Sequence, residues 1–188
     1  MVALTNEPHD RLLGGSRSRA EGLLTKRPRG FSLVELLVVV AIILIVAAIA
    51  IPKLLHSRIA ANQASAVGSL RLLNTANITY ASTYNTGYAA QMSYLGPGNG
   101  GSPAATQAGL IDTVLAGSSG NTSAKSGYNF VYAPGATDTS GRINSYQFNA
   151  GPAVVMVTGM SYYFTDQTGV IRENDTAQAS SSDSPVAG

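Results

Sequence analysis

Glu35 has the most unusual surroundings of any charged residue in this sequence. It lies four residues after Phe31 and directly before residues 36–51, which are sixteen consecutive apolar residues. A carboxylate inside a membrane-length apolar segment costs about 2–3 kcal/mol or more unless it is paired or lies at the interface. The segment contains no Lys or Arg, but a cut after Gly30 would create a positive α-amino group on Phe31. Glu35 is therefore a candidate functional residue, and a new N-terminus at Phe31 is its candidate partner.

The other residues that could do chemistry are few. The chain has no Cys, which excludes a disulfide scaffold, a thiolate metal site and a Cys nucleophile. His9 and His56 are the only histidines, so a His-rich metal site is excluded and a Ser-His-Asp triad is disfavoured. The acids outside the apolar segment fall in expected turns, and no acid/base constellation is visible. We therefore predict that the chain is not an enzyme.

The element that positions Glu35 is expected to be a transmembrane helix. Residues 31–51 make 21 residues, and at about 1.5 Å per residue a helix of that length spans about 30 Å, the thickness of a bilayer core. A single strand in lipid would leave its backbone unpaired, which favours a helix. The alternatives are a core helix or strand buried within the chain, and a cleavable signal peptide ending near residues 47–50.

Charge sets the expected orientation of this helix. The 188-residue chain has a net charge of +2, but residues 1–30 carry six basic and three acidic residues. More positive charge precedes the apolar segment than follows it, which places residues 1–30 in the cytoplasm and the rest across the membrane. Nucleic-acid binding is not predicted, because the basic charge belongs to this leader and not to a folded face.

The residues around Glu35 resemble a known family. K-R-P-R-G-F-S-L-V-E-L-L-V-V-V-A-I-I is similar to the prepilin processing site of type IV pilins and type II secretion pseudopilins. The family pattern is a basic stretch, a Gly, the cut, a Phe, and then an acid at the position of Glu35. The resemblance implies cleavage between Gly30 and Phe31 by a prepilin peptidase, and N-methylation of Phe31. Glu35 can then pair with the Phe31 amine of a neighbouring subunit, which would set the register of assembly.

The same resemblance implies a function. The chain would be a structural subunit of a type IV pilus or a type II secretion pseudopilus, polymerised through its N-terminal helix into a helical homo-oligomer. Its partners would be related minor subunits, the prepilin peptidase, inner-membrane lipid and, indirectly, the assembly platform and ATPase. The precursor would span the bacterial inner membrane once, and the filament would lie in the periplasm or on the cell surface. The alternative is a monomeric signal-anchored binding module in the periplasm or outside the cell.

The helix is expected to continue beyond the membrane. Pro52 either ends the helix or kinks it, and the residues that follow favour a kink. A stripe of helical period continues to about residue 85, where Thr86-Gly87 supplies a stop. We therefore expect residues 31–52 as the membrane and filament-core half, and residues 53–86 as an amphipathic half. The stripe is Ile59, Gln63, Ala66, Leu70, Leu73, Asn77, Tyr80 and Tyr84, and the opposite side holds Arg58, Asn62, Ser65, Ser69 and Thr83.

The rest of the chain predicts an α+β head, in which a small antiparallel sheet packs on the stripe. Residues 87–126 read as a loop with a short helix over 108–116, and residues 127–173 as the sheet, because the period there changes to two. Residues 174–188 lack apolar periodicity and are expected to be a flexible tail. The expected strands cover residues 128–133, 143–149, 154–158, 161–165 and 170–172, with a hairpin turn at residues 166–169.

Calcium is the one cofactor that the resemblance leaves open, because the major pseudopilins bind it near the C-terminus. Asp166, Glu173 and Asp175 are oxygen ligands in that region. No loop with defined ligand spacing is visible, so solvated turn acids are the favoured interpretation. No cofactor and no metal site are predicted.

Processing can be tested directly. We expect the mature protein to begin at Phe31 and to carry one extra methyl group, measured by intact mass spectrometry of the protein isolated from membranes or filaments. A mature species that keeps Gly30, or one cut near residue 50, would contradict the assignment.

Overall fold

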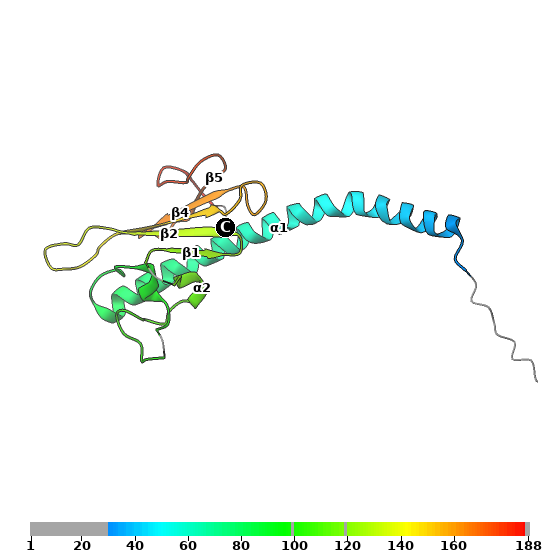
Figure 1. The fold of residues 1–188 in the computed structure, drawn as a ribbon. Coiled ribbons are helices and arrows are strands. Elements are labelled where there is room, and N and C mark those ends of the chain that lie inside the picture. The colour runs from blue at the N-terminus through cyan, green and yellow to red at the C-terminus, as the bar shows by residue number, and fades with distance from the viewer. Residues whose placement is uncertain (1–29, 99, 119, 187–188) are drawn as a thin grey trace, which may run out of the picture. The chain divides into compact units, whose positions relative to one another are not determined.

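The computed structural model describes residues 30–98, 100–118 and 120–186 (Figure 1). The expected leader therefore lies outside the described residues, apart from Gly30. The fold is α+β, as predicted: a long helix packs against a six-stranded antiparallel sheet. The helices are α1 (Leu33–Tyr84), the short 3-10 helix η1 (Met92–Leu95) and α2 (Thr113–Ala116), and the strands are β1 (Thr122–Lys125), β2 (Tyr128–Pro134), β3 (Tyr146–Pro152), β4 (Tyr162–Asp166), β5 (Arg172–Asn174) and β6 (Ser184–Pro185).

The chain divides into two compact units, residues 1–42 and residues 43–188. In the first unit, the described residues are the start of α1, and all of their side chains are exposed. The second unit contains the rest of α1 together with the sheet. We call residues 59–186 of this unit the head. Pro52 lies inside α1, and the helix continues to Tyr84. The alternative in which Pro52 ends the helix is therefore wrong, while the kink stays a prediction.

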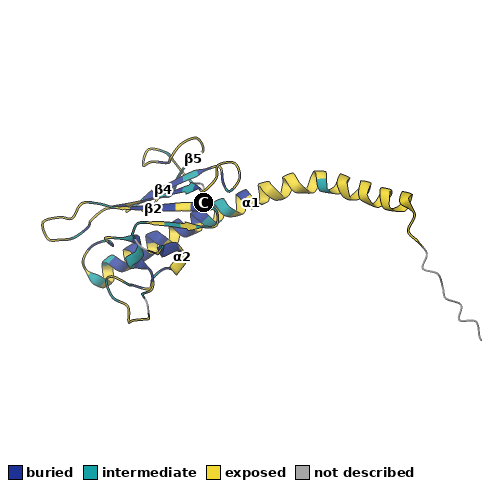
Figure 2. Cartoon of the chain, viewed as in Figure 1, coloured by how far each residue is buried: buried dark blue, intermediate teal, exposed yellow. Residues whose placement is uncertain are grey.

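Burial along α1 begins at Ile59. From there the buried positions recur with helical period, and the predicted stripe lies against the sheet (Figure 2). Gln63 and Tyr84 are its two half-buried members. Ser69, expected on the opposite side, is buried instead. At 100° per residue, the buried positions cover about half of the helix circumference, so the head encloses a wider arc than a single stripe.

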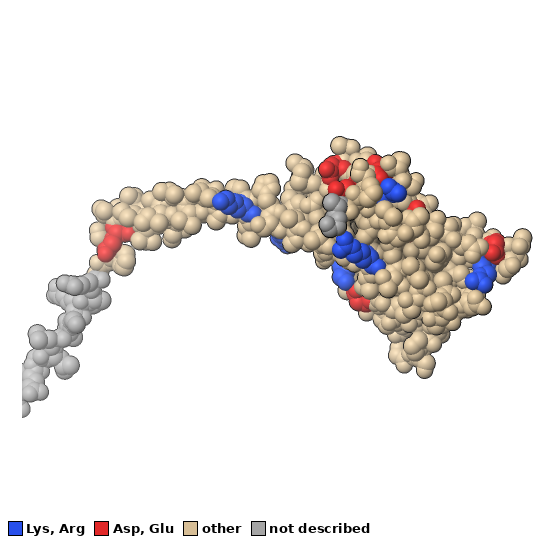
Figure 3. Space-filling view, turned by 180° about the vertical axis from the view of Figure 1, so that it is seen from behind, with Lys and Arg blue, Asp and Glu red and all other residues tan. Residues whose placement is uncertain are grey.

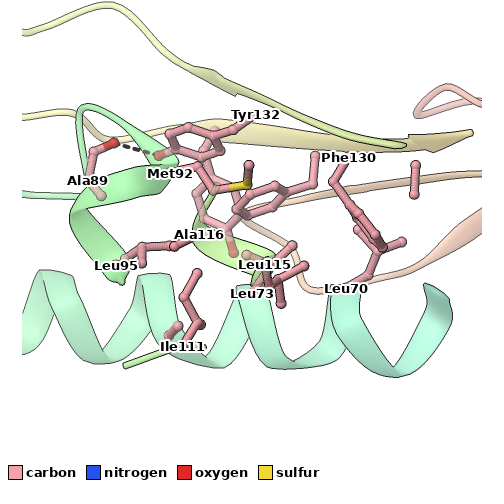
Figure 4. Packing of buried hydrophobic residues seen from close by; sticks show 14 of the residues in the cluster. Leu70, Leu73, Ala89, Met92, Leu95, Ile111, Leu115, Ala116, Phe130 and Tyr132 are labelled. Carbon is pink, nitrogen blue, oxygen red and sulfur yellow. Dashed lines mark hydrogen bonds between the residues drawn. The ribbon is translucent and has the colours of Figure 1, made fainter. Parts of the chain in front are cut away.

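The sheet is a meander in which each strand pairs with the next in sequence. Period-two burial orients its central strands. On β2 the side chains of Tyr128, Phe130 and Tyr132 are buried, and on β3 those of Tyr146 and Phe148 are buried. These aromatic side chains form the core with α1, α2 and η1 (Figure 4).

Buried hydrogen bonds join α1 to this aromatic layer. Asn77 donates to the Tyr132 hydroxyl over 3.2 Å and accepts from the Ala89 amide over 3.1 Å. The Tyr132 hydroxyl in turn donates to the Ala89 carbonyl over 2.6 Å (Figure 4). Burial raises the pKa of Tyr132 to about 12, so its hydroxyl stays protonated as a donor at neutral pH. One turn earlier, Asn74 donates to Thr165 and accepts from Tyr146.

Three expectations about the head are wrong. Residues 154–158 form no strand, although their apolar run is typical of a buried one; their side chains are exposed in a loop between β3 and β4, apart from the half-buried Thr158. The short helix covers only Thr113–Ala116, because Asp112 caps it by accepting from the Val114 and Leu115 amides. The edge strand β1 went unpredicted, because its polar sequence lacks apolar alternation.

The C-terminal segment also differs from the flexible tail that was expected. Residues 174–186 pack on the sheet: β6 pairs with β5, and Ala179 is buried. Asp183 accepts hydrogen bonds from Ser180 and Asn174, and the Ser180 amide bond is the largest cause of its lowered pKa. Side-chain to backbone bonds of this kind leave no trace in apolar periodicity, which explains the wrong expectation.

The helix–sheet packing can be tested with two neighbouring leucines. Leu73 is 0% exposed, whereas Leu72 on the same helix is 40% exposed. In a fragment that begins at Ser57, we expect Leu73→Ala to lower the free energy of unfolding by ~2–5 kcal/mol. The matched control Leu72→Ala should change it by under about 0.5 kcal/mol, with both values taken from urea denaturation. Similar losses for the two variants would contradict the packing described here.

Candidate processing and assembly site

The candidate site lies at the start of α1. Gly30 is exposed, and a Cβ added there would meet no other atom within 4 Å. Phe31 is 76% exposed, and the helix begins two residues later, at Leu33. The Gly30–Phe31 peptide bond therefore lies just before the helix and not within it. A protease can approach this bond without unfolding α1.

Ser32 and Glu35 together form the first turn of α1. The Ser32 carbonyl accepts the first helical hydrogen bond from the Leu36 amide over 3.1 Å. The Ser32 amide donates to the Glu35 carboxylate, with a long N···O distance of 3.4 Å. This is the reciprocal half of a capping box, in which an acid three residues after the N-cap satisfies an amide that has no partner in the helix. The Ser-x-x-Glu spacing is visible in the sequence, so this role of Glu35 was open to prediction and was missed.

Capping does not compensate the charge of Glu35. A backbone amide and the helix N-terminus bring only partial positive charge. Glu35 lies in the first turn of α1, and the residues that follow it in the helix are apolar. Capping therefore holds the Glu35 side chain at the helix start, while a cation is still required to balance it in an apolar surrounding.

The apolar residues that follow Glu35 are not buried by the other residues that the structure describes. From residue 31 to residue 58, Ala47 alone is half-buried and all the others are exposed. The alternative of a core helix buried within the chain is therefore wrong. By length and composition, α1 contains one segment able to cross a membrane, and it fits a membrane-anchored precursor.

Two of the three acids considered as calcium ligands accept hydrogen bonds within the head. Asp166 accepts from the Thr168 amide in the turn after β4, and Asp175 accepts from the Ser161 hydroxyl. Glu173 lies in β5, opposite Tyr163 of β4. Among the residues that the structure describes, no group of three His, Asp or Glu side chains could hold a metal ion. The structure thus does not gather these acids into one site.

The start of the chain was compared with known families. The prokaryotic N-terminal methylation motif matches residues 25–51, and this motif is the signature of type IV pilin and pseudopilin precursors. The chain has the N-terminus of a pilin-like precursor. The match confirms the resemblance seen in the sequence and includes Gly30, Phe31 and Glu35, while residues 52–188 lie outside it. No curated protein and no solved structure matches the chain.

The open surroundings of Gly30 allow a clean test of recognition by the peptidase. Because a side chain at residue 30 meets no atom of the described chain, we expect Gly30→Val to leave the fold intact and to block cleavage. The full precursor should then accumulate in the membrane fraction, measured by intact mass. Gly68, on α1, has equally open surroundings, so the control Gly68→Ala should mature normally. Normal maturation of Gly30→Val would overturn the assigned cleavage site.

Proposed function

We propose that this chain is a structural subunit of a type IV pilus or a type II secretion pseudopilus. It is cleaved between Gly30 and Phe31, methylated at Phe31 and polymerised through α1. The observation that carries the proposal is one acid, Glu35. It lies within the matched methylation motif, in a helix whose apolar surface the described residues leave uncovered. The methylation motif also favours a structural subunit over an enzyme.

The uncovered surface of α1 requires a partner. Large contiguous apolar surfaces are stable only against lipid or protein. Lipid covers this surface while the precursor spans the inner membrane, with the leader in the cytoplasm. Other copies of α1 cover it in a filament in the periplasm or on the cell surface. Related minor subunits, the assembly platform and its ATPase are the further partners of such a subunit.

Charge explains why Glu35 would matter for assembly. Cleavage places an amine at Phe31, near the positive end of the helix dipole, where a cation is unfavourable. Methylation keeps this charge and makes it less costly to remove from water. A neighbouring Glu35 balances the amine, and any other register would leave both charges unpaired in hydrocarbon. The capping bond from Ser32 supports the pairing, since it fixes the carboxylate at the helix start.

One observation favours the alternative of a monomeric, membrane-anchored binding module. A cleft of about 570 Å³ lies over β2, β3 and β4, on the side of residues 178–181. It is lined mainly by amide and hydroxyl side chains, among them Gln147, Asn149 and Gln167. Such a module would bind its ligand in this cleft and would not require Glu35.

Two substitutions of Glu35 separate capping from ionic pairing. Gln keeps an acceptor that can serve in a capping box, whereas Val removes both the acceptor and the charge. We expect Glu35→Gln and Glu35→Val to insert into the membrane as well as the wild type, because both remove a charge from the apolar segment. Both should strongly reduce the yield of sheared filaments, measured by quantitative immunoblotting. The control Glu173→Gln makes the same charge change in the head and should assemble normally.

The outcomes distinguish the candidate functions. Wild-type assembly by Glu35→Gln but not by Glu35→Val would reduce the role of Glu35 to capping. Wild-type behaviour of both variants would favour the monomeric module. Intact mass of each variant shows whether cleavage and methylation at Phe31 still occur, so that a processing defect is not mistaken for an assembly defect.

A further inference from the structure

The loop between β3 and β4 presents apolar side chains to solvent. Val154, Val155, Met156, Val157 and Met160 are each between 41% and 68% exposed. A contiguous exposed apolar patch of this kind marks an interaction site in a folded protein. The head therefore has an apolar surface besides the one on α1, and this loop provides it.

The loop is held in one conformation by its own hydrogen bonds. The Thr158 amide donates to the Val154 carbonyl, and the Met156 amide donates to the Gly159 carbonyl, each over 2.9 Å. The Val154 amide donates to the Thr158 hydroxyl over 3.0 Å. Met156 has a φ of 66°, which is rare for a residue with a long side chain. These bonds keep the apolar side chains of the loop outside the core.

The loop is also fastened to α1. The Asn62 side-chain amide donates to the Thr158 carbonyl over 2.8 Å. Val157 and Thr158 line a groove together with Leu55 and Arg58 of α1. The orange loop therefore lies beside the part of α1 that directly follows the apolar segment (Figure 1).

The position of the loop along α1 corresponds to the edge of a bilayer. The apolar segment ends at Ile51, and Leu55 and Arg58 follow it by four and seven residues. At about 1.5 Å per residue Leu55 lies about 6 Å beyond the hydrocarbon, within the headgroup region of a bilayer, and Arg58 lies about 10 Å beyond it, just outside that region. A loop that lines one groove with Leu55 and Arg58 lies at the outer part of the headgroup region.

Charge near the loop also suits a lipid surface. Arg58 lines the groove beside the loop. Lys53 is exposed on the same helix, two residues before Leu55 in sequence, and Figure 3 shows basic side chains on the helix beside the head. Basic side chains at the interface attract anionic headgroups, while apolar side chains enter the boundary between headgroups and acyl chains. The apolar loop and these two cations therefore provide both parts of an interfacial membrane contact.

We propose that residues 154–160 form a membrane-binding loop, which enters the headgroup region of the leaflet on the head side and holds the head against the bilayer. The partner is a lipid surface that contains anionic headgroups. The proposal rests on the part of the proposed function in which α1 spans the membrane. It adds a second contact, which a subunit would have to release from lipid on entering a filament.

The absence of Cys allows site-specific labelling of the whole chain. Val155→Cys carries an environment-sensitive fluorophore in the loop. Val131→Cys carries the same fluorophore on β2 as a control. The two positions have similar exposure, because Val131 is 45% exposed and Val155 is 49% exposed. Ile45→Cys reports the insertion of α1. Each full-length variant is placed in vesicles of phosphatidylethanolamine and phosphatidylglycerol, with lipids spin-labelled at a shallow or a deep position.

We expect shallow spin-labelled lipid to quench the probe at residue 155 at least severalfold more than the probe at residue 131. Replacing phosphatidylglycerol by phosphatidylcholine should weaken that quenching; unchanged quenching would overturn the role given to Lys53 and Arg58. Equal quenching at residues 155 and 131, with deep quenching at residue 45, overturns the loop proposal and leaves the membrane helix in place. No quenching at residue 45 removes the membrane span, and the loop proposal fails with it.

A second copy of the chain is the competing occupant of the loop. If another copy covers it, the emission of the probe at residue 155 shifts with the protein-to-lipid ratio and is insensitive to spin-labelled lipid. That result would overturn the proposal in favour of a contact between subunits. A shift that persists when the protein is diluted in lipid supports the membrane contact.

Discussion

The rest of the structure depends on one constraint: the first half of α1 has an apolar surface that the described part of the chain leaves uncovered. From residue 31 to residue 58 the side chains are exposed, with Ala47 half-buried. Apolar contact is not directional, so lipid or neighbouring helices could cover this surface in many registers. Glu35 is the one charged side chain in residues 31–51 and would break that equivalence, because only registers that pair its carboxylate avoid burying it alone. Because no other side chain there is charged, Glu35 would determine the register of assembly.

The second half of the same helix meets the same problem within the head. From Ile59 onward the stripe is covered by the sheet, and apolar packing alone would again allow the helix to slide. Asn74 and Asn77 lie on the buried side of this helix, and each joins the buried hydroxyl of a tyrosine on the sheet. A slide by one turn would leave these buried groups without partners, at a cost of about 1–3 kcal/mol for each group. Both halves of α1 thus combine a non-directional apolar surface with a few polar groups: the asparagines define the register of the helix on the sheet, and Glu35 would define the register between subunits.

The parts of the molecule that could be predicted from sequence are those whose signal is local and apolar. The helical stripe and strands β2, β3 and β4 follow from periodicity, and the site follows from a short motif. Residues 154–158 were misread because an apolar run normally indicates burial, and here the run faces outward. Strand β1 and residues 174–186 are stabilised by polar contacts, such as those of Asp183 with Ser180 and Asn174. Such polar contacts do not produce apolar periodicity, so these parts could not be predicted from it.

Processing at Gly30 would change the charge of the chain without changing its fold. The capping contacts of α1 involve Ser32, Glu35 and Leu36, all of which follow the proposed cut. The helix start is therefore complete before the leader is removed and remains complete afterward. The cut would remove the six basic side chains of the leader, which would hold the N-terminus on the cytoplasmic side. In their place it leaves one amine, four residues from Glu35. Maturation would thus replace a charge pattern suited to membrane orientation with one that another copy of the chain can neutralise.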